Sequence, residues 1–424
     1  MHSMDLSLYG LTKVEGHSNL FLRVRKGVVE KAQLDITENA RFFEEMVVGR
    51  SYKDIPTFTS RICGVCSTSY VSASVKAIEK AFGVETTEQT RLMQNLMLIG
   101  EIIRSHTLHL YFFSLPDYLG KDSILDFEEK HHEEIHRAIR IKKVASEIVK
   151  VFGGRAIHPV NATIGGFKVI PYQKQLNELY DHLKKARKDA VKCIELFNSF
   201  KYECVRPSTY ISLVNNDYSL NTGMVCSNKG MCIPEEEYLS NLREYVVSFS
   251  TAKFAKLFGE EFYVGALSRY NLMHKRIRKE TRNELNRIGV KLKEQCPYAN
   301  NLAQAVEILH FIDYAIDKIK DLKLREESIP PITPRKSVGI GVVEAPRGTL
   351  YHSYKFDEKG TVKECNLVVP TAQNVASIER DIKLFLPSLL KKPKEEISLE
   401  MEKLIRAYDP CFSCSAHFLK VKWG

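Results

Sequence analysis

Two short stretches, RICGVC at residues 61–66 and DPCFSCSAH at residues 409–417, each carry a pair of cysteines. Two thiols three positions apart can hold one metal ion, because a tight turn lets both sulfurs converge. A local zinc knuckle has its pairs about 15–20 residues apart, whereas here most of the chain lies between them. Only the completed fold could join the two pairs, which predicts one buried transition-metal centre.

The four candidate ligands are Cys63, Cys66, Cys411 and Cys414. Thiolates are soft ligands, which select zinc, iron–sulfur clusters, nickel or copper(I) over magnesium or calcium. A structural four-cysteine zinc is the plain alternative, but a site that the whole fold assembles is more often functional. The scattered spacing of the cysteines predicts reduced, cytosolic thiols. We expect the other six to be structural; they are residues 193, 204, 226, 232, 296 and 365.

The composition argues against several classes of protein. With 424 residues, 44% of them hydrophobic, the chain can bury a sizeable core. Its net charge of +10 is spread along the chain and mixed with glutamate, as at residues 391–403, which is typical of solvated helix faces. We therefore expect no nucleic-acid partner. The sequence lacks a run of about 18 apolar residues that would predict a membrane span. Residues 1–10 lack the pattern of a secretory signal, so we expect a cytoplasmic protein.

Two segments alternate between apolar and polar residues, as strands do. The first covers about residues 18–36 and turns at residues 26–27. The second covers about residues 338–369 and turns at residues 358–360. We expect both segments to form β hairpins.

Apolar residues at helical spacing predict helices through most of residues 87–325 and 373–407. Thr86 and Gln89 are a candidate capping box at the start of this region. Individual helical patterns cover about residues 128–150, 174–200, 236–257 and 390–407. We expect a mainly α fold with a small β portion (α+β), in which residues 1–424 form one domain. A large helical bundle would be its core, with β hairpins from the N-terminal and C-terminal regions.

The pattern RxCGxC at the first pair and DPCxxCxxH at the second resembles the paired signature of the nickel–iron hydrogenase large subunit. That family also has one motif near each end. Further matches lie at residues 14–17, 41–44, 105–109, 153–166, 265–271, 299–304, 344–348 and 369–374. Each match alone is modest, but together they run in order over nearly the whole chain. The length and the stretch GGRAIH at residues 153–158 are most similar to cytosolic members, including the NAD(P)-linked and sulfhydrogenase-type alpha subunits.

The resemblance implies reversible heterolytic oxidation of H2 and reduction of protons at a nickel–iron centre. Cys63 and Cys411 would be terminal nickel ligands. Cys66 and Cys414 would bridge nickel to an iron that carries cyanide and carbon monoxide. Cleavage of H2 also needs a base beside the metal, and the Cys411 thiolate is the candidate.

Three other residues match the catalytic positions of the family. Glu15 matches the proton-relay glutamate, although on its own it would be taken for an ordinary surface residue. Arg347 matches the arginine that overhangs the metal site. Its very high pKa makes it a poor base, so we expect it to position groups and to hold Asp409 by paired hydrogen bonds.

The resemblance also places residues around the diatomic ligands. Thr371 matches the position that donates a hydrogen bond to a cyanide. Pro346, Leu350 and Val369 would line the cofactor. Packing in the core is the plain alternative for the apolar residues, and both roles can hold at once.

Glu44, the carbonyl of Leu367 and His417 match a site for magnesium, or another divalent cation, near the C-terminus. One carboxylate, one carbonyl, one imidazole and several waters suit Mg²⁺, which keeps part of its hydration shell. His106, His109 and His158 would lie near the metal or at a subunit interface. A solvated helix face is the expectation for His131, His132 and His136.

The sequence departs from the family at a few positions. Tyr70 stands where the family often has histidine, and Lys13 where it often has arginine. Residues 418–424 follow His417, after which family members are usually trimmed once nickel is loaded. We therefore expect this tail to be removed by a maturation protease, after nickel-insertion factors have acted.

The chain needs an electron route that its own sequence does not supply, because it has no cluster-type cysteine set and no convincing dinucleotide fingerprint. The resemblance implies an iron–sulfur small subunit, and beyond it flavin and NAD(P) or other electron-transfer subunits. Two alternatives stay open. One is a structural four-cysteine zinc protein. The other is the related quinone-site subunit of respiratory complex I, which shares the fold but lacks the four cysteines.

Overall fold

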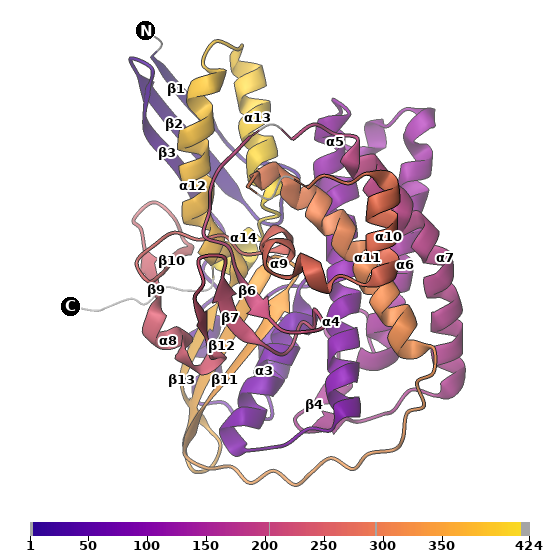
Figure 1. The fold of residues 1–424 in the computed structure, drawn as a ribbon. Coiled ribbons are helices and arrows are strands. Elements are labelled where there is room, and N and C mark those ends of the chain that lie inside the picture. The colour runs from indigo at the N-terminus through magenta and orange to yellow at the C-terminus, as the bar shows by residue number, and fades with distance from the viewer. Residues whose placement is uncertain (1–2, 203, 293–294, 417–424) are drawn as a thin grey trace, which may run out of the picture.

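The computed structural model describes residues 3–202, 204–292 and 295–416, and its largest part is a layer of long helices (Figure 1). These helices are α3 (Ser67–Phe82), α4 (Glu88–Leu108), α6 (His132–Gly153), α7 (Gln173–Asn198) and α11 (Asn300–Ile319). Helix α4 contacts α3, α6 and α11. Helix α6 approaches closely at Gly100, where a side chain would come within 2.9 Å of the Ala145 carbonyl oxygen. The predicted helical core is therefore present, with α4 at its centre.

The N-terminal strands form an antiparallel sheet of β1 (Met4–Leu8), β2 (Ser18–Arg25) and β3 (Val28–Ile36), in that order. The predicted turn at Lys26 and Gly27 joins β2 to β3, and both residues have positive φ, 51° and 81°. This conformation is typical of a tight hairpin turn. The buried face of the sheet packs against α12 (Pro370–Leu389), which lies beside it in Figure 1.

The C-terminal strands form a second antiparallel sheet of β11 (Ser337–Ala345), β12 (Gly348–Phe356) and β13 (Val362–Val368). Helix α3 lies directly on β11. A side chain at Gly341 would come within 2.4 Å of the Ala73 carbonyl oxygen, so only glycine permits this contact. The close contact fixes the start of α3, and with it the first cysteine pair, against the hairpin of β11 and β12.

Shorter elements connect these layers. The remaining helices are α1 (Phe43–Val47), α2 (Ile55–Ser60), a π-helical turn (His109–Ser114), α5 (Leu115–Tyr118), α8 (Tyr238–Asn241), α9 (Ala266–Met273), α10 (Lys279–Ile288), α13 (Lys394–Ala407) and α14 (Phe412–Ser415). The 3₁₀ turns are Ile124–Asp126, Glu129–His131, Glu235–Glu237, His274–Arg276 and Pro297–Ala299. The remaining strands are β4 (Ala162–Thr163), β5 (Gly166–Phe167), β6 (Ile211–Val214), β7 (Met224–Ser227), β8 (Cys232–Ile233), β9 (Leu242–Val246) and β10 (Lys253–Leu257).

The predicted helix over residues 236–257 is wrong. Only the end of the 3₁₀ turn Glu235–Glu237 and the short α8 are helical there, and β9 and β10 pair as an antiparallel hairpin. Aromatic and β-branched residues such as Tyr245, Val246 and Phe254 favour strands, and this preference outweighs an apparent helical spacing. The predicted capping box of Thr86 and Gln89 is wrong as well, because the Gln89 side chain donates to the Arg325 carbonyl instead. Thr87 is the N-cap of α4 and accepts a hydrogen bond from the Thr90 backbone N–H at 3.0 Å.

The expectation of reduced thiols fails for four of the six other cysteines. Cys204 is bonded to Cys296, and Cys226 to Cys232. Cys226 and Cys232 lie at facing positions of β7 and β8. Their separation of six residues in the sequence does not by itself reveal this pairing. The α+β class is otherwise confirmed: a helical core carries hairpins from both ends of the chain. Within the ranges that the structure describes, no helix is long and apolar enough to cross a membrane.

Candidate metal centre

The structure brings the two cysteine pairs together. Cys63 and Cys66 lie in the turn between α2 and α3, and Cys411 and Cys414 lie at α14. The four sulfur atoms are buried and all lie within 4.8 Å of one another. The sulfurs of Cys63 and Cys411 are 3.7 Å apart although 348 positions separate them in sequence. This is the convergence that the sequence predicted.

Arg347 lies over this cluster at the turn between β11 and β12. Its Nη1 is 3.3 Å from the Cys66 sulfur. Its Nε donates to the backbone oxygen of Asp409 at 2.7 Å, and its Nη2 donates to the Asp409 carboxylate at 2.9 Å. The predicted paired hydrogen bonds between Arg347 and Asp409 are therefore present. Gln304 of α11 donates to the other carboxylate oxygen at 3.0 Å, a partner that the sequence did not identify.

The charge balance of the cluster favours a metal cation. Burial raises the pKa of the Cys411 and Cys414 thiols well above the ordinary value. Within the described ranges, the cation in contact with a sulfur is Arg347, and its charge is already balanced by Asp409. Four buried thiolates would thus need positive charge from outside the chain. A soft divalent or trivalent metal supplies it and lowers the thiol pKa at the same time.

Glu15 lies beside the cluster. Its Oε2 is 2.9 Å from the Cys411 sulfur, and its backbone oxygen accepts a hydrogen bond from the Phe412 N–H at 2.8 Å. Gly16 permits this approach, because a side chain there would come within 2.7 Å of the Ser413 backbone nitrogen. The N-terminal segment therefore packs directly against the second cysteine motif. Glu15 is within hydrogen-bond reach of a thiol, as predicted.

Other predicted residues surround the cluster less directly. Thr371 Oγ1 accepts a hydrogen bond from the Cys411 backbone N–H at 2.9 Å, so the threonine helps to hold the second pair. Pro346, Leu350 and Val369 are buried. The carbonyl of Pro346 accepts a hydrogen bond from Arg269 at 3.2 Å. Their contacts with a cofactor stay a prediction.

The predicted magnesium ligands lie only partly within the described residues, because His417 is outside them. Glu44 Oε1 accepts a hydrogen bond from the Leu367 backbone N–H at 2.7 Å. Lys253 of β10 lies between two carboxylates, 3.2 Å from Glu44 Oε2 and 3.0 Å from Glu244 Oε2. Burial raises the pKa of Glu44 to about 7. Lys253 and Glu244 were not predicted as site residues, since both lie in the segment that was expected to be helical.

The histidines fall into a buried or partly buried group and an exposed group, and the predicted places of the first group near the metal or at a subunit interface stay a prediction. His106 is fully buried and binds Glu307 at 2.8 Å. His109 binds Gln304 at 2.6 Å, one hydrogen bond away from Asp409. His158 supports the first cysteine pair, because its ring binds the Ser60 carbonyl at 2.9 Å. The solvated positions are His131, His132 and His136, which are all partly or fully exposed.

The two departures from the family pattern have clear environments. Tyr70 is buried one turn after Cys66, and its ring centroid is 5.6 Å from that of His352. The neutral Tyr70 is favoured, since burial raises its pKa well above the ordinary value. Lys13 forms an ion pair with Asp117 at 2.6 Å.

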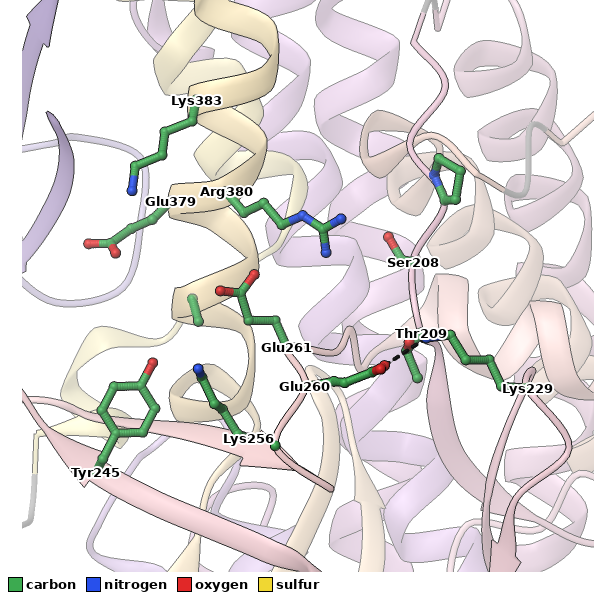
Figure 2. Close-up of a pocket in the computed structure, with 13 residues that line it drawn as sticks. Ser208, Thr209, Lys229, Tyr245, Lys256, Glu260, Glu261, Glu379, Arg380 and Lys383 are labelled. Atoms are coloured by element: carbon green, nitrogen blue, oxygen red, sulfur yellow. Dashed lines mark hydrogen bonds and ion pairs between the residues drawn. The ribbon is translucent and has the colours of Figure 1, made fainter. Parts of the chain in front are cut away.

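A separate surface groove of about 710 Å³ lies between α12 and β10. Figure 2 shows Arg380, Glu261 and Lys256 pointing into it from different elements. Lys229 and Glu260 form an ion pair of 2.7 Å at one side. None of the residues that line this groove belongs to the metal centre.

A buried four-thiol cluster with a carboxylate and a guanidinium beside it can hold a soft transition metal next to a group that accepts a proton. The family model of the nickel-dependent hydrogenases matches residues 41–140 and 234–417. The chain therefore belongs to the nickel-dependent hydrogenase family, in which it is a large, catalytic subunit.

Two similar proteins are from Pyrococcus furiosus. Sulfhydrogenase 2 subunit alpha is 33% identical over 99% of this chain and 100% of its own. Sulfhydrogenase 1 subunit alpha is 31% identical over 99% of both chains. Among solved structures, an NAD+-reducing [NiFe]-hydrogenase in the H2-reduced state matches with a TM-score of 0.88 and 25% identity, covering 98% of this chain and 99% of that chain.

Proposed function

We propose that this subunit oxidises H2 and reduces protons reversibly at a nickel–iron centre held by its four cysteines. Cys63 and Cys411 would bind nickel alone, and Cys66 and Cys414 would bridge nickel to an iron that carries cyanide and carbon monoxide. When bound, the centre would supply heterolytic cleavage of H2 and take up the electrons. The observation that carries the proposal is the convergence of four buried sulfurs within 4.8 Å.

The chain's own residues would handle the proton. The Cys411 sulfur would accept it, and Glu15 would carry it away, because its Oε2 is already 2.9 Å from that sulfur. A carboxylate within hydrogen-bond distance is well placed for such a transfer. Glu15 is partly exposed, so the proton could leave toward solvent.

Arg347 and Asp409 would fix the geometry above the metals. The two hydrogen bonds between them hold the guanidinium in one orientation, with Nη1 directed at Cys66. From there it could donate to diatomic ligands. Thr371 would donate to a cyanide, while Pro346, Leu350 and Val369 would form the wall that excludes water.

The cluster of Glu44, Glu244 and Lys253 would adjoin a magnesium ion or another divalent cation. Glu44, the carbonyl of Leu367 and His417 would be its ligands, in agreement with the preference of Mg²⁺ for oxygen donors. Cleavage after His417 by a maturation protease would then produce a C-terminus beside this ion.

Electrons would leave through an iron–sulfur small subunit that docks where the first cysteine pair is nearest to solvent. Arg61 and Gly64, which flank Cys63, are exposed. The neighbouring Ile157 and Val160 are 47% and 48% exposed, which suits a partner surface. Flavin and NAD(P) subunits would follow in a cytoplasmic complex, and the name of one relative, an NAD-reducing hydrogenase subunit, agrees with NAD as an acceptor.

Metal analysis and infrared spectroscopy of the purified complex test the proposal. We expect nickel together with iron, the iron in excess because the small subunit would carry iron–sulfur clusters, and absorption bands from bound cyanide and carbon monoxide. Zinc alone would establish the structural zinc protein instead. A complex free of metal at the four cysteines would favour the quinone-site alternative.

A further inference from the structure

Ser413 lies between the two cysteines of the second pair and contacts Glu15 twice. Its hydroxyl donates to Glu15 Oε1 at 2.5 Å. Its backbone N–H donates to Glu15 Oε2 at 3.2 Å. The same Oε2 is the atom 2.9 Å from the Cys411 sulfur. Ser413 therefore contacts both oxygens of the carboxyl group that faces the thiol.

The backbone alone does not fix this carboxyl group. The hydrogen bond from the Phe412 N–H to the Glu15 carbonyl and the close approach at Gly16 hold the main chain. Three side-chain torsions of Glu15 are still free to rotate. The backbone N–H of Ser413 touches only one oxygen, and a single contact permits rotation about it. The hydroxyl on the other oxygen removes that freedom.

We infer that Ser413 is a positioning residue that holds Glu15 with Oε2 directed at the Cys411 sulfur. The inference rests on the proposed function, because it gives the serine a part in the transfer of the proton. It also explains why a small hydroxyl residue suits this place. The side chain must reach the carboxyl without crowding Cys411, whose sulfur is 4.0 Å from the hydroxyl oxygen.

The test compares Ser413→Ala, Ser413→Thr and Ser415→Ala in the purified complex. Ser415 is the matched control: it lies in the same α14, but its hydroxyl donates to the Phe412 carbonyl at 2.8 Å and not to Glu15. Each variant is measured for nickel content, for the infrared band of the Glu15 carboxyl group, identified by its loss in Glu15→Gln, and for H2 oxidation in H2O and in D2O.

We expect Ser413→Ala to keep its nickel and its carbon monoxide band. Its Glu15 band should move to higher frequency, because a hydrogen bond to the carboxyl is lost. H2 oxidation should fall about tenfold with a larger solvent isotope effect, since a misplaced proton acceptor slows transfer. Ser413→Thr should restore the wild-type values, and Ser415→Ala should retain them.

Several results would overturn the inference. These are a Ser413→Ala variant with the wild-type band and rate, one that loses its nickel, a threonine variant that behaves like the alanine variant, or an equal loss in Ser415→Ala. Failure of the proposed function itself is distinguishable, because the wild-type complex would then lack nickel and diatomic ligands before any variant is made.

Discussion

Two buried clusters of ionisable groups in this subunit differ in how much positive charge they already contain. The sulfur cluster touches Arg347, whose charge is shared with Asp409. The carboxylate cluster contains Lys253, which contacts both Glu44 and Glu244. In the sulfur cluster, the negative charge of four thiolates is far larger than the positive charge of one shared guanidinium. In the carboxylate cluster, the negative charge of two carboxylates is larger than the positive charge of one ammonium by a single unit. The first cluster therefore depends on a metal for its charged form, and the second is nearly balanced by the chain itself.

Cys411→Ser breaks the sulfur cluster and should have the largest effect. The variant loses a soft ligand and the proton acceptor together, so we expect loss of nickel and a fall in H2 oxidation of more than about 10⁴-fold. Nickel analysis and an activity assay measure both. Cys193→Ala is the control, because Cys193 is also fully buried but lies in α7. Nickel retained at wild-type stoichiometry in Cys411→Ser would contradict the ligand assignment.

Lys253→Met breaks the balance of the carboxylate cluster. Removal of one partner leaves buried carboxylates unpaired, which costs about 3 kcal/mol in the free energy of unfolding. We expect a lower melting temperature of the complex by calorimetry, with nickel content unchanged. Lys256→Met is the matched control on the same strand. Its ammonium lies over the Tyr245 ring at 5.8 Å. Equal melting temperatures for the two variants would show that the ion pairs contribute little.

Arg347→Lys tests whether the shape of the cation over the sulfurs matters as much as its charge. Lysine keeps the charge but lacks the planar fork that donates to both the backbone oxygen and the carboxylate of Asp409. We expect retained nickel and a fall in H2 oxidation of about 10²-fold, the usual cost of one misplaced donor. Infrared spectra should show shifted bands of the diatomic ligands. A variant with the wild-type rate and infrared bands would show that only the positive charge of Arg347 matters, and not its shape.

Magnesium should have the smallest effect, because Lys253 already supplies most of the charge that Glu44 and Glu244 require. After treatment with a chelator, added Mg²⁺ is expected to stabilise the wild-type complex by about 1 kcal/mol. Thermal unfolding in chelator and in Mg²⁺ measures this difference. Glu44→Gln should abolish it. A shift of equal size in that variant would place the bound ion elsewhere.

The contrast between the clusters also separates what the sequence could predict from what it could not. The alternation of Leu20, Leu22 and Val24 and the spacing of the cysteine pairs are local patterns, and the structure agrees with both. Lys253 and Glu244 face Glu44 only because β9 pairs with β10. The hairpin itself is local, and the strand propensity of Tyr245 and Val246 indicates it. The contact of Lys253 with Glu44 joins residues 209 positions apart, which leaves no local signal.

Ser413 illustrates a second limit. It occupies one of the unspecified positions between Cys411 and Cys414, where a motif records only the spacing. Its contact with Glu15 depends on a segment 398 positions earlier in the chain. The disulfides of Cys204 with Cys296 and of Cys226 with Cys232 depend in the same way on the folded arrangement.

The junction between Glu15 and residues 411–413 has a consequence for biosynthesis. Its two halves are 396 positions apart in the sequence, so one is synthesised long before the other. The cluster therefore cannot form before residues 411–414 have been synthesised, however well the helical layer has already folded. Until then, Cys63 and Cys66 lack the second pair of sulfurs with which they would share a metal.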